Sequence, residues 1–332
     1  MVRKALLVGI NDYQQVNDLK GCINDVTNLR NILKTFLGFQ NSDLRVLTDA
    51  RATKANILTR LNWLVRGAKA GDFLLFQFSG HGSQIRDRDG DELSDHMDEL
   101  ICPFDMDWDG NYITDDDLRD IFKKLPQGVT LEVVLDSCHS GTGLRAAVDL
   151  GRPIEFGRPV EWGGSAELER EAYRRARYLP PPPDIVARWE GEEDLLEAPH
   201  AFRNLVRAST HQILWAGCKD FQTSADAFIN GTYNGAFTYY FCRAMREAGG
   251  ALARSELLRR VRQSLAHNRY EQIPQLECDP AVRNMKAFTF GERKTDGKVE
   301  GRAIRQGAGA TPVKSTSLTA PPSRATSMKM SK

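Results

Sequence analysis

The sequence has no apolar run long enough to cross a membrane and no strong excess of either charge. Its first apolar stretch, residues 5–10, ends at Asn11 and Asp12, so it is too short for a secretory signal or a membrane span. The 45 lysines and arginines nearly balance the 44 aspartates and glutamates, so there is no general basic field for nucleic acid. These absences lead us to expect a cytoplasmic protein that binds neither nucleic acid nor membrane.

Paired cysteine motifs are also missing. The six cysteines are scattered through the chain without a CxxC pair, which argues against a disulfide framework and against a cysteine-rich zinc module. Most of them are expected to be small buried apolar residues. The 332 residues are 41% hydrophobic and 27% charged, an ordinary globular composition that suits one sizeable α/β domain or two small ones.

Short apolar segments of strand length alternate with amphipathic segments of helix length. The predicted strands are residues 4–10, 72–78, 131–135 and 211–216, and the predicted helices are residues 25–39, 53–69, 114–124, 235–247 and 255–267. Gln275 and Leu276 are expected to begin a short edge strand. This alternation predicts parallel strands joined by right-handed crossovers. The predicted fold class is therefore α/β, a doubly wound, mostly parallel sheet flanked by helices.

Two regions differ from this pattern. Residues 146–200 contain charged patches and the run Pro180–Pro183, which excludes regular helix and central strand, so we expect an exposed linker or insertion there. Residues 291–332 contain no aromatic side chain, and nine basic residues face three acidic ones, so we expect a disordered basic tail. Residues 1–145 and 201–290 are therefore predicted to be the two structured regions.

Reactive residues follow two of the predicted strands. His81 lies just after the strand that ends at Phe78, and Cys138 just after the strand that ends at Leu135. In a parallel sheet the carboxyl ends of neighbouring strands meet at one edge, so we expect His81 and Cys138 to meet. A thiol beside an imidazole suits nucleophilic catalysis, with the histidine as general acid and base, and the backbone N–H groups of Gly82 and Cys138 could stabilise an oxyanion. The alternative is a buried structural cysteine beside a hydrogen-bonded histidine.

Several motifs in this order resemble the caspase and metacaspase peptidases, and most closely the metacaspases, including their prokaryotic members. The matching stretches are Gly21–Asp25, Phe78–Gln84, Asp98–Asp105 and Asp136–Gly141, followed by the weaker matches Gln222–Asp226, Gly235–Thr238 and Gln275–Leu276. The resemblance implies a caspase-like three-layer α/β/α sandwich in which Cys138 and His81 form a dyad that cleaves peptide bonds. It also implies a large-subunit-like region at residues 1–145 and a small-subunit-like region at residues 201–290 that completes the same sheet.

The resemblance also bears on specificity, because metacaspases favour arginine or lysine before the scissile bond. Asp136 lies two residues before the nucleophile and Asp25 lies in a loop after the first strand, so their carboxylates could line a pocket for a cationic side chain. Ser79 is expected to line the same pocket. For Asp25 the alternative is helix capping at the start of its own helix.

Calcium is the one cofactor that the sequence suggests. Residues 87–99 hold seven carboxylates, and many metacaspases bind calcium in this neighbourhood, so Asp98 and Glu99 are candidate ligands. Arg145, however, stands where the calcium-binding members carry an aspartate, which leaves calcium dependence open. The segment Asp105–Asp116 resembles an EF-hand loop, but Pro103 denies it a preceding helix and predicts a turn instead. No organic cofactor is expected.

The sequence therefore predicts a cysteine endopeptidase that cleaves proteins or peptides after arginine or lysine. We expect it to cut itself between Thr142 and His200, near Arg174, Arg175 or Arg177, because this segment is charged and is expected to be exposed. Two other hypotheses remain. One is a signalling or scaffold protein that keeps the fold without proteolysis, and the other is a related cysteine hydrolase with a different specificity.

Overall fold

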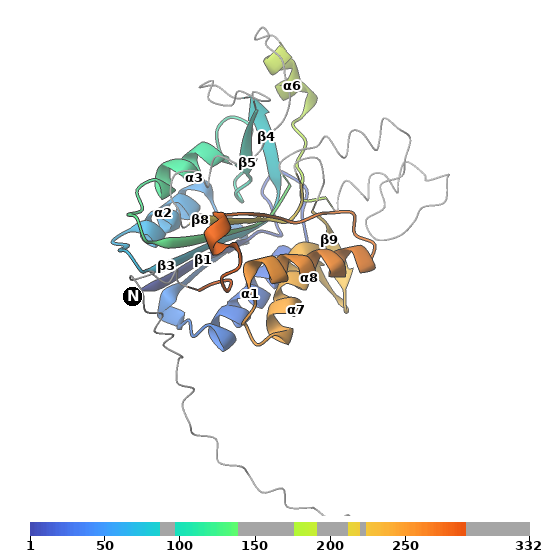
Figure 1. Cartoon of the computed structure of the whole chain (residues 1–332). Helices are drawn as coiled ribbons and strands as arrows, with labels where there is room; N and C mark the ends of the chain where they lie inside the picture. Colours follow the sequence, from blue (N-terminus) through green and yellow to red (C-terminus); the bar gives the residue numbers. More distant parts are fainter. Residues whose placement is uncertain (87–96, 139–175, 191–211, 220–223, 290–332) are drawn as a thin grey trace, which may run out of the picture. The chain divides into compact units, whose positions relative to one another are not determined.

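A six-stranded sheet forms the centre of the unit Met1–Gly291 in the computed structural model, which describes residues 1–86, 97–138, 176–190, 212–219 and 224–289 (Figure 1). The strands are β1 (Arg3–Gly9), β2 (Leu44–Thr48), β3 (Phe73–Ser79), β7 (Thr130–Asp136), β8 (Gln212–Ala216) and β11 (Gln275–Glu277), in the order β11-β8-β7-β3-β1-β2. Neighbouring strands are parallel except β11, which pairs antiparallel with β8 at one edge. The predicted α/β class with a mostly parallel sheet is confirmed.

Helices cover both faces of this sheet (Figure 1). One face carries α2 (Lys54–Val65) and α3 (Asp115–Phe122), and the other carries α1 (Cys22–Phe36), α7 (Ala236–Glu247) and α8 (Arg254–His267). Every side chain of β7 is buried because this strand lies between the two helical layers. The layers form an α/β/α sandwich with one apolar core on each face.

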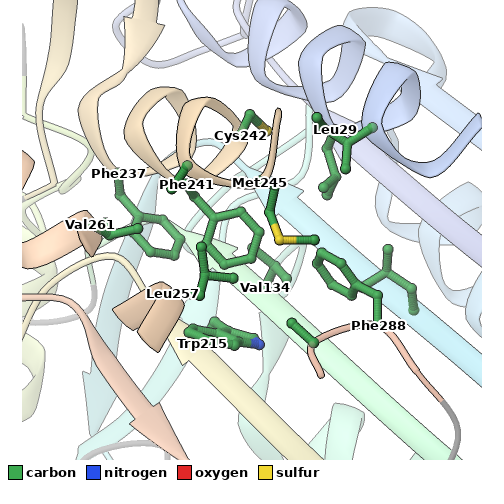
Figure 2. Packing of buried hydrophobic residues seen from close by; sticks show 14 of the residues in the cluster. Leu29, Val134, Trp215, Phe237, Phe241, Cys242, Met245, Leu257, Val261 and Phe288 are labelled. Atoms are coloured by element: carbon green, nitrogen blue, oxygen red, sulfur yellow. The ribbon is translucent and has the colours of Figure 1, made fainter. Parts of the chain in front are cut away.

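The core on the α7 side contains several aromatic rings packed on the middle of the sheet (Figure 2). Phe241 of α7 meets Trp215 of β8 edge-on, with the ring centroids 5.2 Å apart. Phe288 packs on the same phenylalanine, with the centroids 5.7 Å apart. Val134 of β7 belongs to this core, so the core joins β7 and β8 to the helices that follow them.

Two small antiparallel sheets and several short elements complete the fold. β4 (Gly82–Arg86), β5 (Met97–Ile101) and β6 (Ile113–Thr114) form one sheet, and β9 (Asp226–Ile229) pairs with β10 (Thr232–Gly235) in the other. The short helices are α6 (Pro183–Glu190), α9 (Pro280–Arg283) and the 3-10 turns Asn41–Asp43 and Asp49–Arg51. Within the described ranges, no helix combines the length and the apolar character that a membrane span requires. The six cysteines are free thiols, and all but Cys278 are buried, as expected.

The expectation of an exposed linker is wrong for residues 176–179. Ala176 and Arg177 are completely buried, and Tyr178 and Leu179 are only 6% and 8% exposed, whereas Pro180 is exposed. The segment is buried because it docks beyond the carboxyl ends of β3 and β7, where the Gly82 amide donates to its backbone. The rest of the linker before residue 176 and after residue 190, the acidic residues 87–96 and the tail from residue 290 lie outside the described residues.

A buried carboxylate joins β7 to three later parts of the chain. Glu132, which is completely buried, accepts hydrogen bonds from Trp215 Nε1 at 3.0 Å, Arg254 Nε at 3.1 Å and the Phe288 amide at 2.8 Å. It also forms an ion pair with the guanidinium of Arg254. Each donor comes from a different element, so removing the carboxylate leaves several buried polar groups without their acceptor.

We predict that Glu132→Ala lowers the free energy of unfolding by about 3 to 5 kcal/mol, because it leaves the Arg254 charge buried and unpaired. Urea unfolding followed by fluorescence measures the change. The matched control is Glu256→Ala, which removes a solvent-accessible carboxylate paired with Arg259 and Arg260 at the surface and should change the unfolding midpoint far less. Equal midpoints for the two variants would contradict the role given to Glu132.

Candidate active site

The parallel register of β3 and β7 brings the two predicted reactive residues to the same edge of the sheet. Ser79 pairs with Asp136 at the carboxyl ends of these strands, and His81 and Cys138 each lie two residues further along the chain. Both side chains are buried, with His81 2% exposed and Cys138 completely enclosed. The topology therefore places an imidazole and a thiol at the position where open α/β sheets bind their ligands.

The imidazole of His81 is held in one tautomer. Its Nε2 lies 2.7 Å from the carbonyl oxygen of Asn17, and because a carbonyl only accepts, Nε2 carries the proton. Nδ1 is buried and has no hydrogen-bond partner among the described residues, so its lone pair is available as a base. Burial lowers the pKa of His81 to about 4, which keeps the ring neutral near neutral pH. Tyr13 accepts from the His81 amide at 2.8 Å and packs its ring 5.0 Å from the imidazole.

Cys138 is enclosed by the backbone of Ser224 and the side chain of Cys218. The Ser224 amide donates to the Cys138 sulfur, and the thiol lies 3.7 Å from the Ser224 carbonyl oxygen. A hydrogen bond with Cys138, together with burial, raises the pKa of Cys218 well above its usual range. Cys218 therefore stays a neutral thiol, which also lies 3.8 Å from the carbonyl oxygen of Ser137.

The two amides predicted to stabilise an oxyanion converge on one carbonyl oxygen. The Gly82 amide donates to the carbonyl oxygen of Arg177 at 3.0 Å, and the Cys138 amide donates to the same oxygen at 3.1 Å. The Arg177 amide in turn donates to the Ser224 carbonyl at 3.1 Å. The backbone of Arg177 thus lies beside Cys138, with its carbonyl polarised by two N–H groups.

The side chain of the same arginine occupies a pocket of carboxylates. Its Nη2 lies 2.7 Å from Asp25 Oδ2 and 3.1 Å from Asp226 Oδ1, and its Nη1 lies 3.3 Å from Asp136 Oδ1. Nη1 also donates to the Asp136 carbonyl oxygen at 3.0 Å. The pocket joins the start of α1, the end of β7 and the start of β9, and all four side chains are buried.

Neighbouring groups hold these carboxylates in place. Asp136 accepts from Ser224 Oγ at 2.5 Å and from the Thr238 hydroxyl and amide at 2.6 and 3.0 Å, while Asp25 accepts from the Gly235 amide at 2.9 Å. A Cβ on Gly235 would lie 2.2 Å from Asp136 Oδ2 and 2.5 Å from the Arg177 guanidinium, so only glycine leaves room for the cation. Burial raises the pKa of Asp25 to about 7 even though Arg177 acts to lower it.

Sequence reasoning found only part of this pocket. Asp25 and Asp136 contact the cation directly, and the Asp25 carboxylate is used there instead of capping its own helix. None of the hydrogen bonds that Arg177 makes to the described residues reaches Ser79, whose hydroxyl accepts from Gln77 at 2.7 Å. Asp226 was not predicted, although it lies in the weakly matching stretch Gln222–Asp226, which was the one available signal.

The two predicted metal ligands, Asp98 and Glu99, lie on β5. In the register of β4 and β5, Asp98 stands opposite Ile85 and Glu99 opposite Gln84. Among the described residues, no group of three or more histidine, cysteine, aspartate or glutamate side chains could hold a metal. Residues 87–96 lie outside the described chain. Calcium dependence therefore stays a prediction.

The segment that resembles an EF-hand loop contains the expected turn. Asp107 accepts hydrogen bonds from the amides of Asp109 at 2.9 Å and Asn111 at 3.0 Å, and from Asn111 Nδ2 at 3.0 Å. These bonds, led by the one from the Asn111 backbone, lower the pKa of Asp107. Its carboxylate is therefore used to close the turn.

Comparison with known proteins identifies the family of this chain. A family model described as the metacaspase peptidase C14 domain matches residues 3–147. Metacaspase-1 of Coccidioides immitis is 37% identical over 311 residues, covering 83% of this chain and 61% of that protein. Metacaspase-1 of Ajellomyces capsulatus is 36% identical over 292 residues, covering 83% of this chain and 79% of that protein. A crystal structure of a Geobacter sulfurreducens protein has the same fold, with a TM-score of 0.60 at 23% identity, and the match covers 88% of this chain and 100% of that one.

These relatives confirm the resemblance predicted from the motifs. The identity extends well beyond the His81 and Cys138 motifs, into the part of the chain that supplies β8, α7 and α8. The chain belongs to the metacaspase family of C14 cysteine peptidases.

Proposed function

We propose that this protein is an endopeptidase that cleaves after arginine or lysine and cuts its own chain after Arg177. The observation that carries the proposal is the position of that one residue. Its guanidinium lies among three carboxylates, and its carbonyl oxygen accepts from the Gly82 and Cys138 amides. A residue before a scissile bond needs both contacts at once, because they fix the side chain and polarise the carbonyl in one placement.

The dyad acts on the bond between Arg177 and Tyr178. The Cys138 thiol passes its proton to Nδ1 of His81, and the sulfur attacks the Arg177 carbonyl carbon. The carbonyl oxygen takes up the negative charge between the Gly82 and Cys138 amides. The imidazolium gives the proton to the Tyr178 nitrogen as the C–N bond breaks, and water then hydrolyses the thioester to an Arg177 carboxylate and a free thiol.

The charge of the pocket explains why a basic side chain is selected. Asp25, Asp136 and Asp226 bring three carboxylates into a buried site, and Arg177 supplies one positive charge. A neutral side chain would leave the carboxylates to repel one another without solvent, and an acidic one would add a fourth negative charge. Lysine supplies the same charge without the two-pronged contact, so arginine should be the better substrate.

We predict that Cys138→Ala lowers hydrolysis of an arginyl reporter peptide by about a thousandfold or more, because no other group replaces the sulfur. His81→Ala should be nearly as severe. Cys278→Ala is the matched control, because this thiol is half-buried and far along the chain from both motifs, and its activity should equal that of the wild type. Activity retained by Cys138→Ala would show that another residue is the nucleophile.

The second prediction separates charge from shape in the pocket. Four reporter peptides that differ only before the scissile bond carry arginine, lysine, citrulline or glutamate. Citrulline has nearly the shape of arginine but no charge, so its kcat/KM should fall by about a hundredfold, and glutamate should not be cleaved. Equal rates for arginine and citrulline would mean that the carboxylates do not determine specificity.

The third prediction concerns self-cleavage. Wild-type protein should yield a fragment that begins at Tyr178, Arg177→Lys should yield the same fragment, and Arg177→Gln should not. The control is Arg188→Gln, because this guanidinium lies in the same part of the chain but its side chain is 60% exposed. Sequencing the fragment ends checks the result, and parallel samples with calcium and with a chelator test the calcium expectation. Cutting after Arg174 or Arg175 instead would contradict the assignment.

A further inference from the structure

The residues after Arg177 are held as closely as the arginine itself. The Leu179 amide donates to the Gly82 carbonyl at 2.9 Å, and the Ser83 hydroxyl donates to the Leu179 carbonyl at 2.6 Å. Tyr178 pairs with Gly82 in parallel β-bridge geometry. Both backbone groups of Leu179 are therefore bound by the first two residues of β4, which follows directly from the histidine motif.

We propose that the start of β4 forms a substrate subsite that selects an apolar side chain two residues after the scissile bond. The inference rests on the proposed function, since Arg177 must be the residue before that bond for Leu179 to be the second residue after it. Cleavage specificity would then depend on two side chains on opposite sides of the bond. One is the basic residue in the carboxylate pocket, and the other is the apolar residue beside β4.

Burial of the Leu179 side chain supplies the chemistry of this selection. The residue is 8% exposed and belongs to the same apolar core as Ile85 of β4 and Leu100 of β5. A charged side chain at this position would lose its water without gaining a partner, whereas leucine gains from leaving water. The next residue, Pro180, is exposed and has no N–H to donate, so the bound stretch ends after the second residue.

The hydrogen bonds make the subsite usable by other peptides. They involve only main-chain groups of the bound segment, so any extended peptide can form them, as when a strand is added to a sheet edge. On the other side of the scissile bond, Ala176 pairs antiparallel with Ala225, and the Arg177 amide bonds to the Ser224 carbonyl. A substrate would therefore be held by Ser224 and Ala225, just before β9, on one side of the bond and by β4 on the other.

Internally quenched peptides test the subsite on the full-length enzyme. Peptides containing Ala-Arg-Tyr-Xaa are compared with Xaa as leucine, alanine or aspartate, beside an arginyl reporter that ends at the scissile bond. We expect the leucine peptide to exceed the aspartate peptide in kcat/KM by about tenfold or more, with alanine between them. Equal rates for the three peptides with an active reporter would overturn the subsite and leave the proposed function standing. A reporter that is not cleaved would overturn both.

Variants give an independent test. Ser83→Ala should lower kcat/KM for the leucine peptide by about threefold to tenfold relative to kcat/KM for the short arginyl reporter, because only the longer peptide has a residue that reaches Ser83. Ser255→Ala, which removes an exposed hydroxyl on α8, is the control.

Self-cleavage tests the same subsite within the chain. The Leu179→Met variant should be cut at Arg177 as fast as the wild type, and the Leu179→Asp variant should be cut at least about tenfold more slowly. Unchanged cutting of Leu179→Asp, or equal losses on both substrates for Ser83→Ala, would contradict the subsite.

Discussion

The ion pairs between Arg177 and its three carboxylates hold together parts of the chain that are far apart in sequence. Asp25 lies in the first turn of α1, Asp136 ends β7, and Asp226 begins β9, so the guanidinium lies where three elements meet. Asp226 also accepts from the amides of Lys20 and Gly21, which fixes the turn before α1. Because buried charges are costly without partners, the shape of this edge of the sheet depends on a cation being present.

In the proposed self-cleavage, the same contacts that would present the Arg177 bond also block the site. While Arg177 fills the pocket and the Gly82 and Cys138 amides hold its carbonyl, another peptide has no free place to bind. Under this proposal the uncut chain is both substrate and competitor, and a peptide in solution must displace a segment tethered at high effective concentration. The pocket must then stay folded around any basic residue that replaces Arg177, and the hydrogen bonds from Ser224 and Thr238 to Asp136 favour this.

Local patterns predicted the elements that depend on local chemistry. The strands that end near His81 and Cys138 are short and mostly apolar, and the helices that follow Thr53 and Thr114 have hydroxyl caps, so both were found from sequence. The docking of residues 176–179 was not predicted from the sequence, because charged residues followed by a proline run are typical of exposed segments. Burial of Arg177 depends on carboxylates up to 152 residues away, and no local pattern reports such a contact. Asp226 was missed for the same reason.

Hydrogen–deuterium exchange of the full-length Cys138→Ala protein tests the central claim most directly, because this variant keeps the segment uncut. If residues 176–179 occupy the site, the amides of Arg177 and Leu179 should be strongly protected from exchange, because each is hydrogen-bonded. The amides of Gly82 and of the alanine at position 138 should be protected for the same reason. Adding the substitution Arg177→Gln should remove that protection, whereas adding Arg188→Gln should preserve it. Exchange of the Arg177 and Leu179 amides at the rate of an unstructured peptide would contradict the account.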